Sequence, residues 1–266
     1  MNWRLLLAMV CVPTVLAFDV LLIRRMLTAW RRAHRQAHLF IIAGTAMSYV
    51  LGLAGTALVV LEVDQGGADA VLWAATRGTL TLATGVSIAC VALFGAAAFR
   101  ERSLPAQRFA WGFSSVVVGL TAFGMLSEPV DVPSPATWSY GLRLPLVMLN
   151  VSAFGWVAHA ALRTHASLAE ARRLGRDTNP LVLRRMQVLG RGSALAAVGQ
   201  LSLLLPAVHS RIDVGVLGWT AMSASLLGAL AFVMAIFLTW ATPEWVRERW
   251  QREAEVAALR EPVESA

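Results

Sequence analysis

The chain has 266 residues, of which 57% are hydrophobic, and it carries a formal net charge of +7 with 23 basic residues, all of them arginine. This apolar content exceeds the roughly 45–50% usual in a soluble domain and is typical of a polytopic membrane protein. The absence of lysine excludes a retinal Schiff base and a Gly-Lys-Ser/Thr phosphate loop, and the sequence has no hydrolase or zinc-protease motif. The composition therefore predicts a membrane protein without catalytic machinery of its own.

Seven apolar runs of membrane-spanning length follow one another along the chain, at residues 5–23, 39–61, 79–99, 109–127, 142–162, 192–208 and 214–241. A helix needs about 20 such residues to cross the hydrocarbon core. Because the runs are continuous, whereas barrel strands alternate, they predict an all-α, seven-transmembrane helix bundle over residues 1–241. The first run also permits a cleaved signal peptide, but it continues through Ile23 to Arg24 and Arg25, as a retained helix does.

The arginines determine the expected orientation of the bundle. Nineteen of the 23 lie in every second gap between the runs, at residues 24–35, 100–108, 163–191 and 247–260. Because basic residues stay on the cytoplasmic side during insertion, these gaps are predicted inside, with the N-terminus outside and the C-terminus in the cytoplasm. The expected location is a bacterial inner membrane. The arginines of the inner loops are expected to contact anionic inner-leaflet lipid rather than nucleic acid.

The longest inner loop carries clear helix-boundary signals. Residues 167–174 are predicted to extend the fifth helix until Gly175 ends it. Residues 181–188, after the Asn179-Pro180 pair, are predicted to begin the sixth helix on the cytoplasmic side.

The tail, residues 242–266, is predicted to form a cytoplasmic helix and a disordered end. Its first residues, Thr242-Pro243-Glu244, offer an N-cap, a proline at the first helical position and an acid in the first turn. Tryptophans and arginines alternate beyond this start, so we expect an amphipathic helix on the inner membrane surface. The alternative is that the last helix continues into solvent.

Charged and imidazole side chains from different helix ends are expected to meet at the outer rim. Two arginines there each begin an inward-running helix, where the positive end of the helix dipole adds to the guanidinium charge. An anionic ligand is therefore one candidate, and salt bridges between rim residues are the other. The rim set is Glu62, Arg77, Glu128, Arg143, His209 and Arg211.

Polar side chains inside the apolar runs are costly in hydrocarbon and mark candidate sites. Asn150 lies near the middle of the fifth run and Gln200 near the middle of the sixth, and the two are expected to hydrogen-bond across neighbouring helices. Ser152, Gly155 and His159 share a helical face in the fifth run. This face is expected to form either a polar packing seam or a small binding pocket.

Asp19 is the one acidic residue within a run. It lies about one turn from Arg24, so the sequence predicts an Asp–Arg pair at the inner boundary. A proton-carrying acid is the alternative interpretation.

Small residues recur at about every fourth position of the second run, at Gly44, Ser48, Gly52 and Gly55. Such residues let helix backbones approach closely. They predict a packing face within the bundle, with a dimer seam or a substrate path as the alternatives.

No metal ion or cofactor is predicted. His34 and His38 have the four-residue spacing that puts two imidazoles on one side of a helix, with His159 near the inner face as a third. No cysteine or intervening acid completes this set. A metal site, or a haem held by His38 and His159, is therefore only an alternative.

The layout resembles the seven-helix membrane modules that precede histidine kinases and other outputs in bacterial sensors. Besides the alternation of runs and arginines, the resemblance is carried by residues 172–186 (RRLGRDTNPLVLRRM) and 240–250 (WATPEWVRERW). It implies a non-catalytic sensor or receptor that acts through a separate cytoplasmic signalling protein, because no output domain follows in this sequence. The other hypotheses are a small-solute transporter or channel component, and a structural or assembly subunit of a membrane complex.

Overall fold

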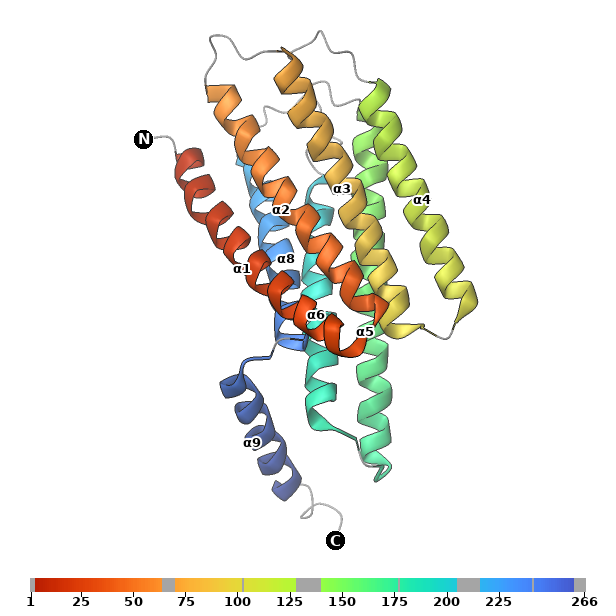
Figure 1. Cartoon of the computed structure of the whole chain (residues 1–266). Helices are drawn as coiled ribbons and strands as arrows, with labels where there is room; N and C mark the ends of the chain where they lie inside the picture. Colours follow the sequence, from red (N-terminus) through yellow and green to blue (C-terminus); the bar gives the residue numbers. More distant parts are fainter. Residues whose placement is uncertain are drawn as a thin grey trace.

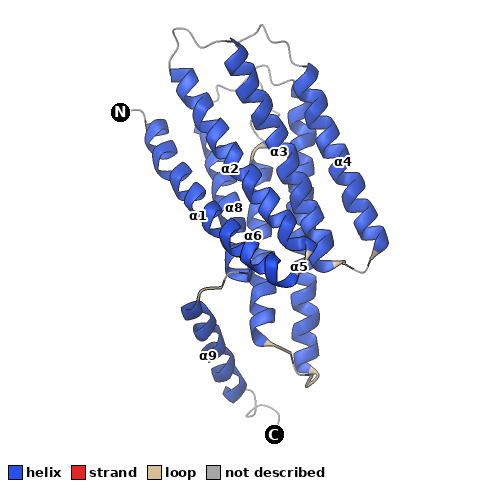
Figure 2. Ribbon diagram, in the orientation of Figure 1, coloured by secondary structure: helices blue, strands red, loops and turns tan. Residues whose placement is uncertain are grey.

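The structure, a computed structural model, describes residues 3–63, 70–101, 103–127, 140–176, 178–204, 216–240 and 242–260. These residues fold into helices, and no strand occurs among them (Figure 2). The helices are α1 (Trp3–Ala33), α2 (Gln36–Val63), α3 (Ala70–Phe99), α4 (Leu104–Ser127), α5 (Tyr140–Arg173), α6 (Pro180–Ser202), α8 (Val216–Trp240) and α9 (Glu244–Arg260).

Each predicted apolar run coincides with one of the helices that precede α9. The first five runs lie wholly within α1 to α5, the sixth overlaps α6 and the seventh overlaps α8. Three described segments are long and apolar enough to cross a membrane, at Gly78–Phe99, Leu144–Arg173 and Ser223–Trp240. The all-helical class is therefore confirmed for the described residues, and the fold is compatible with a membrane location.

From α1 to α8, successive helices run in alternate directions along the bundle (Figure 1). Helix α3 contacts α2, α4 and α5, while α8 contacts both α6 and α1. The spanning segment of α3 is 61% buried, against 28% for that of α5 and 29% for that of α8. α3 is therefore the central helix of the bundle, and its Ile88, Ala92 and Phe94 lie in the main apolar core.

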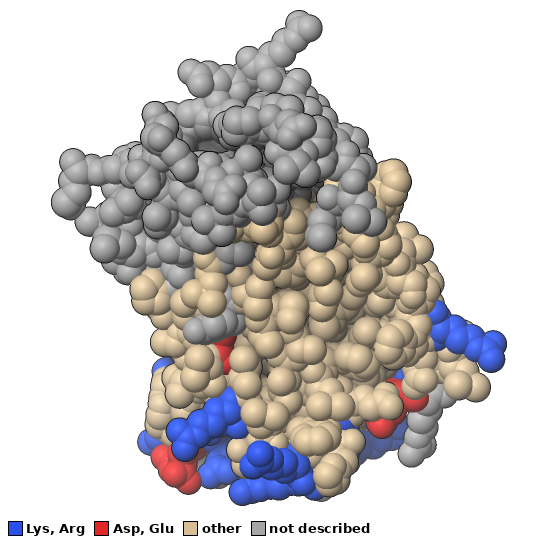
Figure 3. Space-filling model, turned by 45° about the horizontal axis from the view of Figure 1, so that its top comes forward, with Lys and Arg blue, Asp and Glu red and all other residues tan. Residues whose placement is uncertain are grey.

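Large apolar side chains also cover the outside of the bundle. On α4, Phe109, Trp111 and Phe123 are each more than half exposed. Val198 on α6 and Leu227 on α8 are exposed to a similar degree. In Figure 3 the visible charged side chains lie in the lower part of the view, below a band of uncharged ones. An outer surface this apolar is unusual for a soluble monomer and fits contact with lipid.

The inner loop between α5 and α6 has the predicted boundaries. Gly175 ends α5 with a φ of 73°, in the left-handed region that glycine adopts without steric cost. The backbone N–H groups of Gly175 and Arg176 donate to the last carbonyls of the helix. Asn179 then caps α6, because its Oδ1 accepts a hydrogen bond from the Leu181 backbone N–H at 2.9 Å.

The tail helix α9 begins one residue later than predicted. Val246 and Arg247 both donate their backbone N–H groups to the carbonyl of Pro243, so Pro243 rather than Thr242 occupies the N-cap position. The Thr242 hydroxyl donates instead to the Leu238 carbonyl at the end of α8. Among the described helices α9 packs against α6 and extends away from the rest of the bundle (Figure 1). Its predicted position on a membrane surface stays a prediction.

Among the described glycines, the closest backbone approach is between α6 and α8. A Cβ atom added at Gly199 would lie 2.5 Å from the Ala224 carbonyl oxygen, and one at Gly228 would lie 2.9 Å from the Leu195 carbonyl oxygen. Small residues thus hold the two helices in backbone contact. The sequence prediction had placed such a face on α2 instead.

The predicted small-residue face of α2 packs inside the bundle where the structure describes it. A Cβ atom at Gly44 would lie 3.2 Å from Cys90 Cβ on α3. Ser48 and Gly44 both line a small cavity between α2, α3, α5 and α8. Gly52 and Gly55 lie outside the residues whose side-chain surroundings are described.

Candidate functional site

A chain of hydrogen bonds links three helices of the bundle. Asn150 on α5 donates from Nδ2 to Gln200 Oε1 on α6 at 2.8 Å, and Gln200 Nε2 donates to Ser225 Oγ on α8 at 2.8 Å. Interhelical hydrogen bonds of this kind contribute about 0.6 kcal/mol on average and up to about 1.7 kcal/mol. These two hydrogen bonds hold α6 in position between α5 and α8. Sequence reasoning singled out Asn150 and Gln200 but missed Ser225, which is one of several small polar residues in its helix.

The junction between α6 and α9 is made by exposed charged groups. Arg184 on α6 donates from Nη2 to Glu253 Oε2 on α9 at 3.1 Å, and Arg249 donates from Nε to Glu253 Oε1 at 3.0 Å. The hydrogen bond from Arg249, together with the charge of Arg184, holds the pKa of the Glu253 carboxyl below its usual value. Both side chains of the Arg184–Glu253 pair are more than a third exposed, so solvent weakens the pair.

Arg185 lies where α6, α8 and α9 meet. Its Nη2 donates to Thr242 Oγ1 at 3.2 Å, and its backbone carbonyl accepts a hydrogen bond from the Thr239 hydroxyl. Its Nε is buried without a partner. Burial, and secondarily the charge of Arg247, lower the pKa of its guanidinium. Arg185 thus ties the connection between α8 and α9 to the start of α6.

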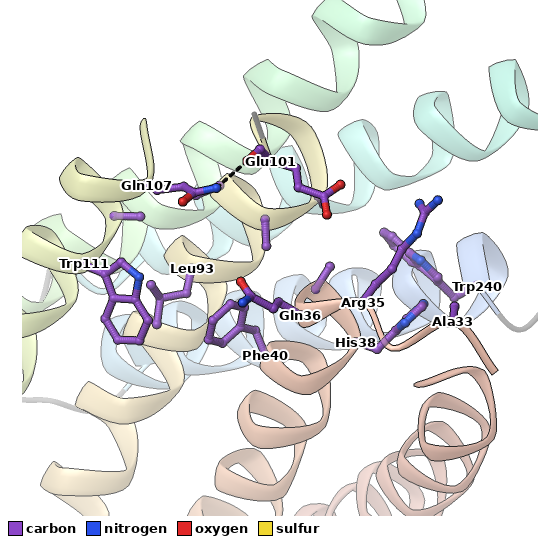
Figure 4. A pocket seen from close by; sticks show the side chains of 15 residues that line it. Ala33, Arg35, Gln36, His38, Phe40, Leu93, Glu101, Gln107, Trp111 and Trp240 are labelled. Atoms are coloured by element: carbon purple, nitrogen blue, oxygen red, sulfur yellow. Dashed lines mark hydrogen bonds between the residues drawn. The ribbon is translucent and has the colours of Figure 1, made fainter. Parts of the chain in front are cut away.

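The arginine-rich end of the bundle contains a cavity of about 350 Å³, which we call the inner-end cavity. It lies between the α1–α2 turn, the last turn of α3, the start of α4 and the end of α8. Its polar and aromatic lining includes Arg35, Gln36, His38, Glu101, Trp111 and Trp240 (Figure 4). His38 is only 6% exposed, and its Nδ1 has no hydrogen-bond partner.

Three aromatic side chains, Phe40, Trp111 and Trp240, contribute to the wall of this cavity, and alanines make up much of the rest. The rings of Phe40 and Trp111 meet edge to face with their centroids 6.2 Å apart, and Trp240 meets Phe94, which lies behind the lining, in the same way at 5.3 Å. Figure 4 shows Trp111 at one end of the cavity and His38 with Trp240 at the other. Nothing in the sequence signals that these helix ends enclose a space.

Asp19 departs from its prediction. It is fully buried on α1, and neither carboxyl oxygen has a hydrogen-bond partner in the described structure. Arg24 is exposed, so the predicted Asp19–Arg24 pair is wrong. Five residues along a helix correspond to about 140° of rotation, which puts the two side chains on different faces. Leu22 and Met26, on the face of Asp19, are buried with it.

Ser152 and His159 lie on the outward face of α5. Both are exposed, and the Ser152 hydroxyl donates to the Met148 carbonyl of its own helix. The inward face of α5 carries Ala153 and Val157, which are buried. The expectation that Ser152, Gly155 and His159 form a seam or pocket inside the bundle is therefore not met.

The outer-rim prediction falls beyond what the structure describes. The side chains of its six members, Glu62, Arg77, Glu128, Arg143, His209 and Arg211, all lie outside the described residues. An anion site or rim salt bridges at that end therefore stay predictions from the sequence.

The histidines do not form the arrangement that their spacing suggested. His34 lies in the α1–α2 turn with a φ of 48°, whereas His38 lies in the first turn of α2. The two are therefore not on one helix, and His159 is exposed on α5. Within the described ranges no three His, Cys, Asp or Glu residues are grouped to hold a metal ion.

In comparisons with known proteins, no family model, no curated protein and no solved structure matches the chain. Functional inference therefore starts from the site geometry and from the sequence pattern.

Proposed function

We propose that the chain is a non-catalytic seven-helix module of a bacterial inner membrane, of sensor or receptor type, that acts through a separate cytoplasmic protein. The observation that carries this proposal is the attachment of α9. The tightly packed helix pair of α6 and α8 is followed by a helix whose ion pair to α6, Arg184–Glu253, is exposed to solvent. Such a helix changes position at little energetic cost, as a signalling output requires.

The two parts of this arrangement differ in strength. Within the bundle, α6 is fixed by backbone contact with α8 and by the Asn150–Gln200–Ser225 hydrogen bonds. Outside it, the Arg184–Glu253 ion pair that links α9 to α6 is exposed, so water solvates both groups well when they separate, while Val246 of α9 is buried. A shift of α6 against its neighbours would therefore change the docking of α9 first.

α9 also presents apolar surface to a partner. Trp245 is 67% exposed and Val256 is 49% exposed, whereas Val246 is buried. Exposed aromatic residues are enriched where proteins bind one another. The partner contact therefore includes Trp245, with anionic inner-leaflet lipid as the neighbour of the surrounding arginines.

The proposed orientation has seven spans, with the N-terminus outside and the C-terminus in the cytoplasm, and it follows from the arginine distribution. A green fluorescent protein fused to the C-terminus is expected to fluoresce, because it folds in the cytoplasm. Alkaline phosphatase fused there is expected to be inactive. Active phosphatase would contradict the orientation.

Photo-crosslinking in cells tests the partner proposal. A benzophenone amino acid replaces Trp245 on α9 and, as the control, the similarly exposed Val116 on α4. We expect position 245, and not position 116, to capture a cytoplasmic protein. Arg184→Ala should change the yield, and the charge reversal Arg184→Glu with Glu253→Arg should restore it. The proposal would be contradicted if positions 245 and 116 captured the same proteins. It would also be contradicted if Arg184→Ala left the crosslinking yield at position 245 unchanged.

The unpartnered carboxyl of Asp19 favours a second candidate, a small-solute or proton transporter. An ionisable group inside a membrane protein often marks an ion pathway. We expect transport, if this is the function, to fall in Asp19→Asn and to persist in the control Ser152→Ala, whose side chain faces outward. Flux into proteoliposomes no greater than into empty vesicles would exclude this candidate.

A further inference from the structure

The guanidinium of Arg185 carries a charge that no acidic side chain of the described residues neutralises. It takes part in none of the ion pairs that the described residues form. Its Nη2 donates to Thr242 Oγ1 and its Nε is closed off from solvent, whereas in the described structure Nη1 neither forms a hydrogen bond nor is closed off in this way. Because a partly buried charge without a counterion is costly, Nη1 is suited to an anion that approaches from the surface.

A second guanidinium, that of Arg247 on α9, lies near the first. Its charge is close enough to lower the pKa of Arg185, in addition to the larger effect of burial. Arg247 is exposed and pairs through Nη2 with Glu244 Oε1 of its own helix at 3.0 Å, while its other nitrogens form no hydrogen bond with the described residues. Two like charges repel each other, so an anion held between them relieves the repulsion as well as compensating the charge of Arg185.

The two arginines lie at the level where the bundle ends. Thr239, whose hydroxyl donates to the backbone carbonyl of Arg185, is next to the last residue of α8, Trp240. Beyond this point α9 leaves the bundle (Figure 1). In the proposed topology this end faces the cytoplasm, so the phosphate groups of inner-leaflet lipids lie at about the same depth.

From these observations we propose that Arg185 and Arg247 hold the phosphate group of an anionic phospholipid between α6 and α9. The planar guanidinium fits phosphate oxygens well, so Arg185 donates to them from Nη1 and Arg247 from the nitrogens that Glu244 does not occupy. Basic sites between helices at the cytoplasmic side of a membrane bind such headgroups. The bound phosphate joins α6 to α9 and adds to the exposed Arg184–Glu253 pair. The assignment of the phosphate to a lipid rests on the proposed function and its topology, whereas phosphate binding by the two arginines does not.

Native mass spectrometry of the full chain in detergent, titrated with phosphatidylglycerol, tests the proposal. We expect one lipid to bind more tightly than all others. Arg185→Gln should weaken its binding about tenfold, as the loss of a charge-assisted hydrogen bond implies. Arg247→Gln should weaken it less, about threefold, because Arg247 is exposed and also pairs with Glu244. The matched control Arg173→Gln removes the same charge from an exposed position at the end of α5 and should leave binding unchanged.

Two further ligands separate a lipid headgroup from free phosphate. Phosphatidylcholine, whose phosphate stands beside a positive choline group, should bind more weakly than phosphatidylglycerol. Inorganic phosphate at the same concentration should not displace phosphatidylglycerol. Equal binding of the two lipids, or displacement by inorganic phosphate, would overturn the assignment to an anionic lipid.

Arg247→Gln keeps the test decisive if Arg185→Gln does not fold, because Arg247 is exposed. The proposal is overturned if Arg247→Gln, or folded Arg185→Gln, binds phosphatidylglycerol as tightly as Arg173→Gln does. It is also overturned if the wild type shows no single tight lipid. Because no cytoplasmic partner is present, these failures are distinct from a failure of the proposed function.

Discussion

Gly199→Ala tests whether α6 and α8 are held in backbone contact. The new methyl group would lie 2.5 Å from the Ala224 carbonyl oxygen and 3.2 Å from the Gly228 Cα atom. Both are backbone atoms, which do not rotate away as a side chain does. The matched control is Gly155→Ala in the middle of α5, where an added Cβ has no atom within 4 Å.

The expected difference follows from the geometry. Close carbon–oxygen contacts in proteins lie at about 3.3–3.6 Å, so the helices have to separate by nearly 1 Å or more. Overpacking of this kind costs about 1–3 kcal/mol, whereas alanine in place of an unobstructed helical glycine stabilises by about 0.5–1 kcal/mol. The gain from alanine applies to both variants, so their free energies of unfolding should differ by the overpacking cost, about 1–3 kcal/mol. At about 2–4 °C per kcal/mol, their midpoints should differ by roughly 2–12 °C.

Thermal unfolding in detergent, followed by far-ultraviolet circular dichroism, measures this difference. Gly199→Ala should unfold below the wild type and Gly155→Ala at or above it. A second pair tests the same interface, because a Cβ at Gly192 would collide with Ala235 Cβ. Ala235→Gly should therefore recover part of the stability lost in Gly192→Ala. If Gly199→Ala unfolds no lower than Gly155→Ala, the proposed backbone contact is refuted.

Three further outcomes are expected. Gln200→Leu removes both hydrogen bonds to Asn150 and Ser225 and should lower the free energy of unfolding by about 1–3 kcal/mol in a thermal or steric-trapping assay; an unchanged value would show that the chain of hydrogen bonds contributes nothing. The pKa of Glu253 is lowered first by Arg249 of α9 itself and further by Arg184 of α6, and only the contribution of Arg184 depends on docking. Docking of α9 is therefore stabilised above the pKa that Glu253 has in the undocked helix, and it loses this stabilisation as the pH falls through the lower value of the docked state. Energy transfer between labels on α6 and α9 should show the change, and Glu253→Gln should remove it; an identical pH profile in the variant would contradict the assignment. Asn179→Ala should cost about 1 kcal/mol through loss of the α6 cap, and Asn179→Asp should not, as thermal unfolding would show.

The sequence predicted the helices because their signals are local. Apolar runs of about 20 residues indicate helices without reference to the rest of the fold. The boundaries around Gly175 and Asn179 depend on the residues beside them, and the structure has them as expected. The start of α9 differs from its prediction by only one residue, because Pro243 rather than Thr242 occupies the N-cap position.

The sequence did not predict which way the helices face. In a helix that is apolar on every side, the hydrophobic pattern contains little information about which side is buried. Ser152 and His159 were therefore expected inside, although the buried face of α5 is the one with Ala153 and Val157. The glycines and alanines of α6 recur at the spacing that a close helix pair requires, but such a pattern was recognised from the sequence only in α2.

The inner-end cavity could not be predicted from the sequence, for a different reason. Its lining comes from two turns and from helix ends that are far apart along the chain, between Ala33 and Trp240. No spacing rule relates such residues. His38 was noticed through its spacing from His34, yet its significance lies in burial without a partner.

The length of α5 has a consequence for the geometry of any complex. The apolar run ends at residue 162, but the helix continues for the eleven residues 163–173, or about 16 Å at about 1.5 Å per residue. Each headgroup layer of a bilayer is only about 5–8 Å thick. In the proposed topology, the α5–α6 hairpin projects beyond the lipid headgroups, and Arg184, which pairs with Glu253 of α9, lies on it four residues after the start of α6. A cytoplasmic partner that docks there would meet a protein surface clear of the bilayer, so the shape and charge of the hairpin, more than the lipid composition, would govern its recognition.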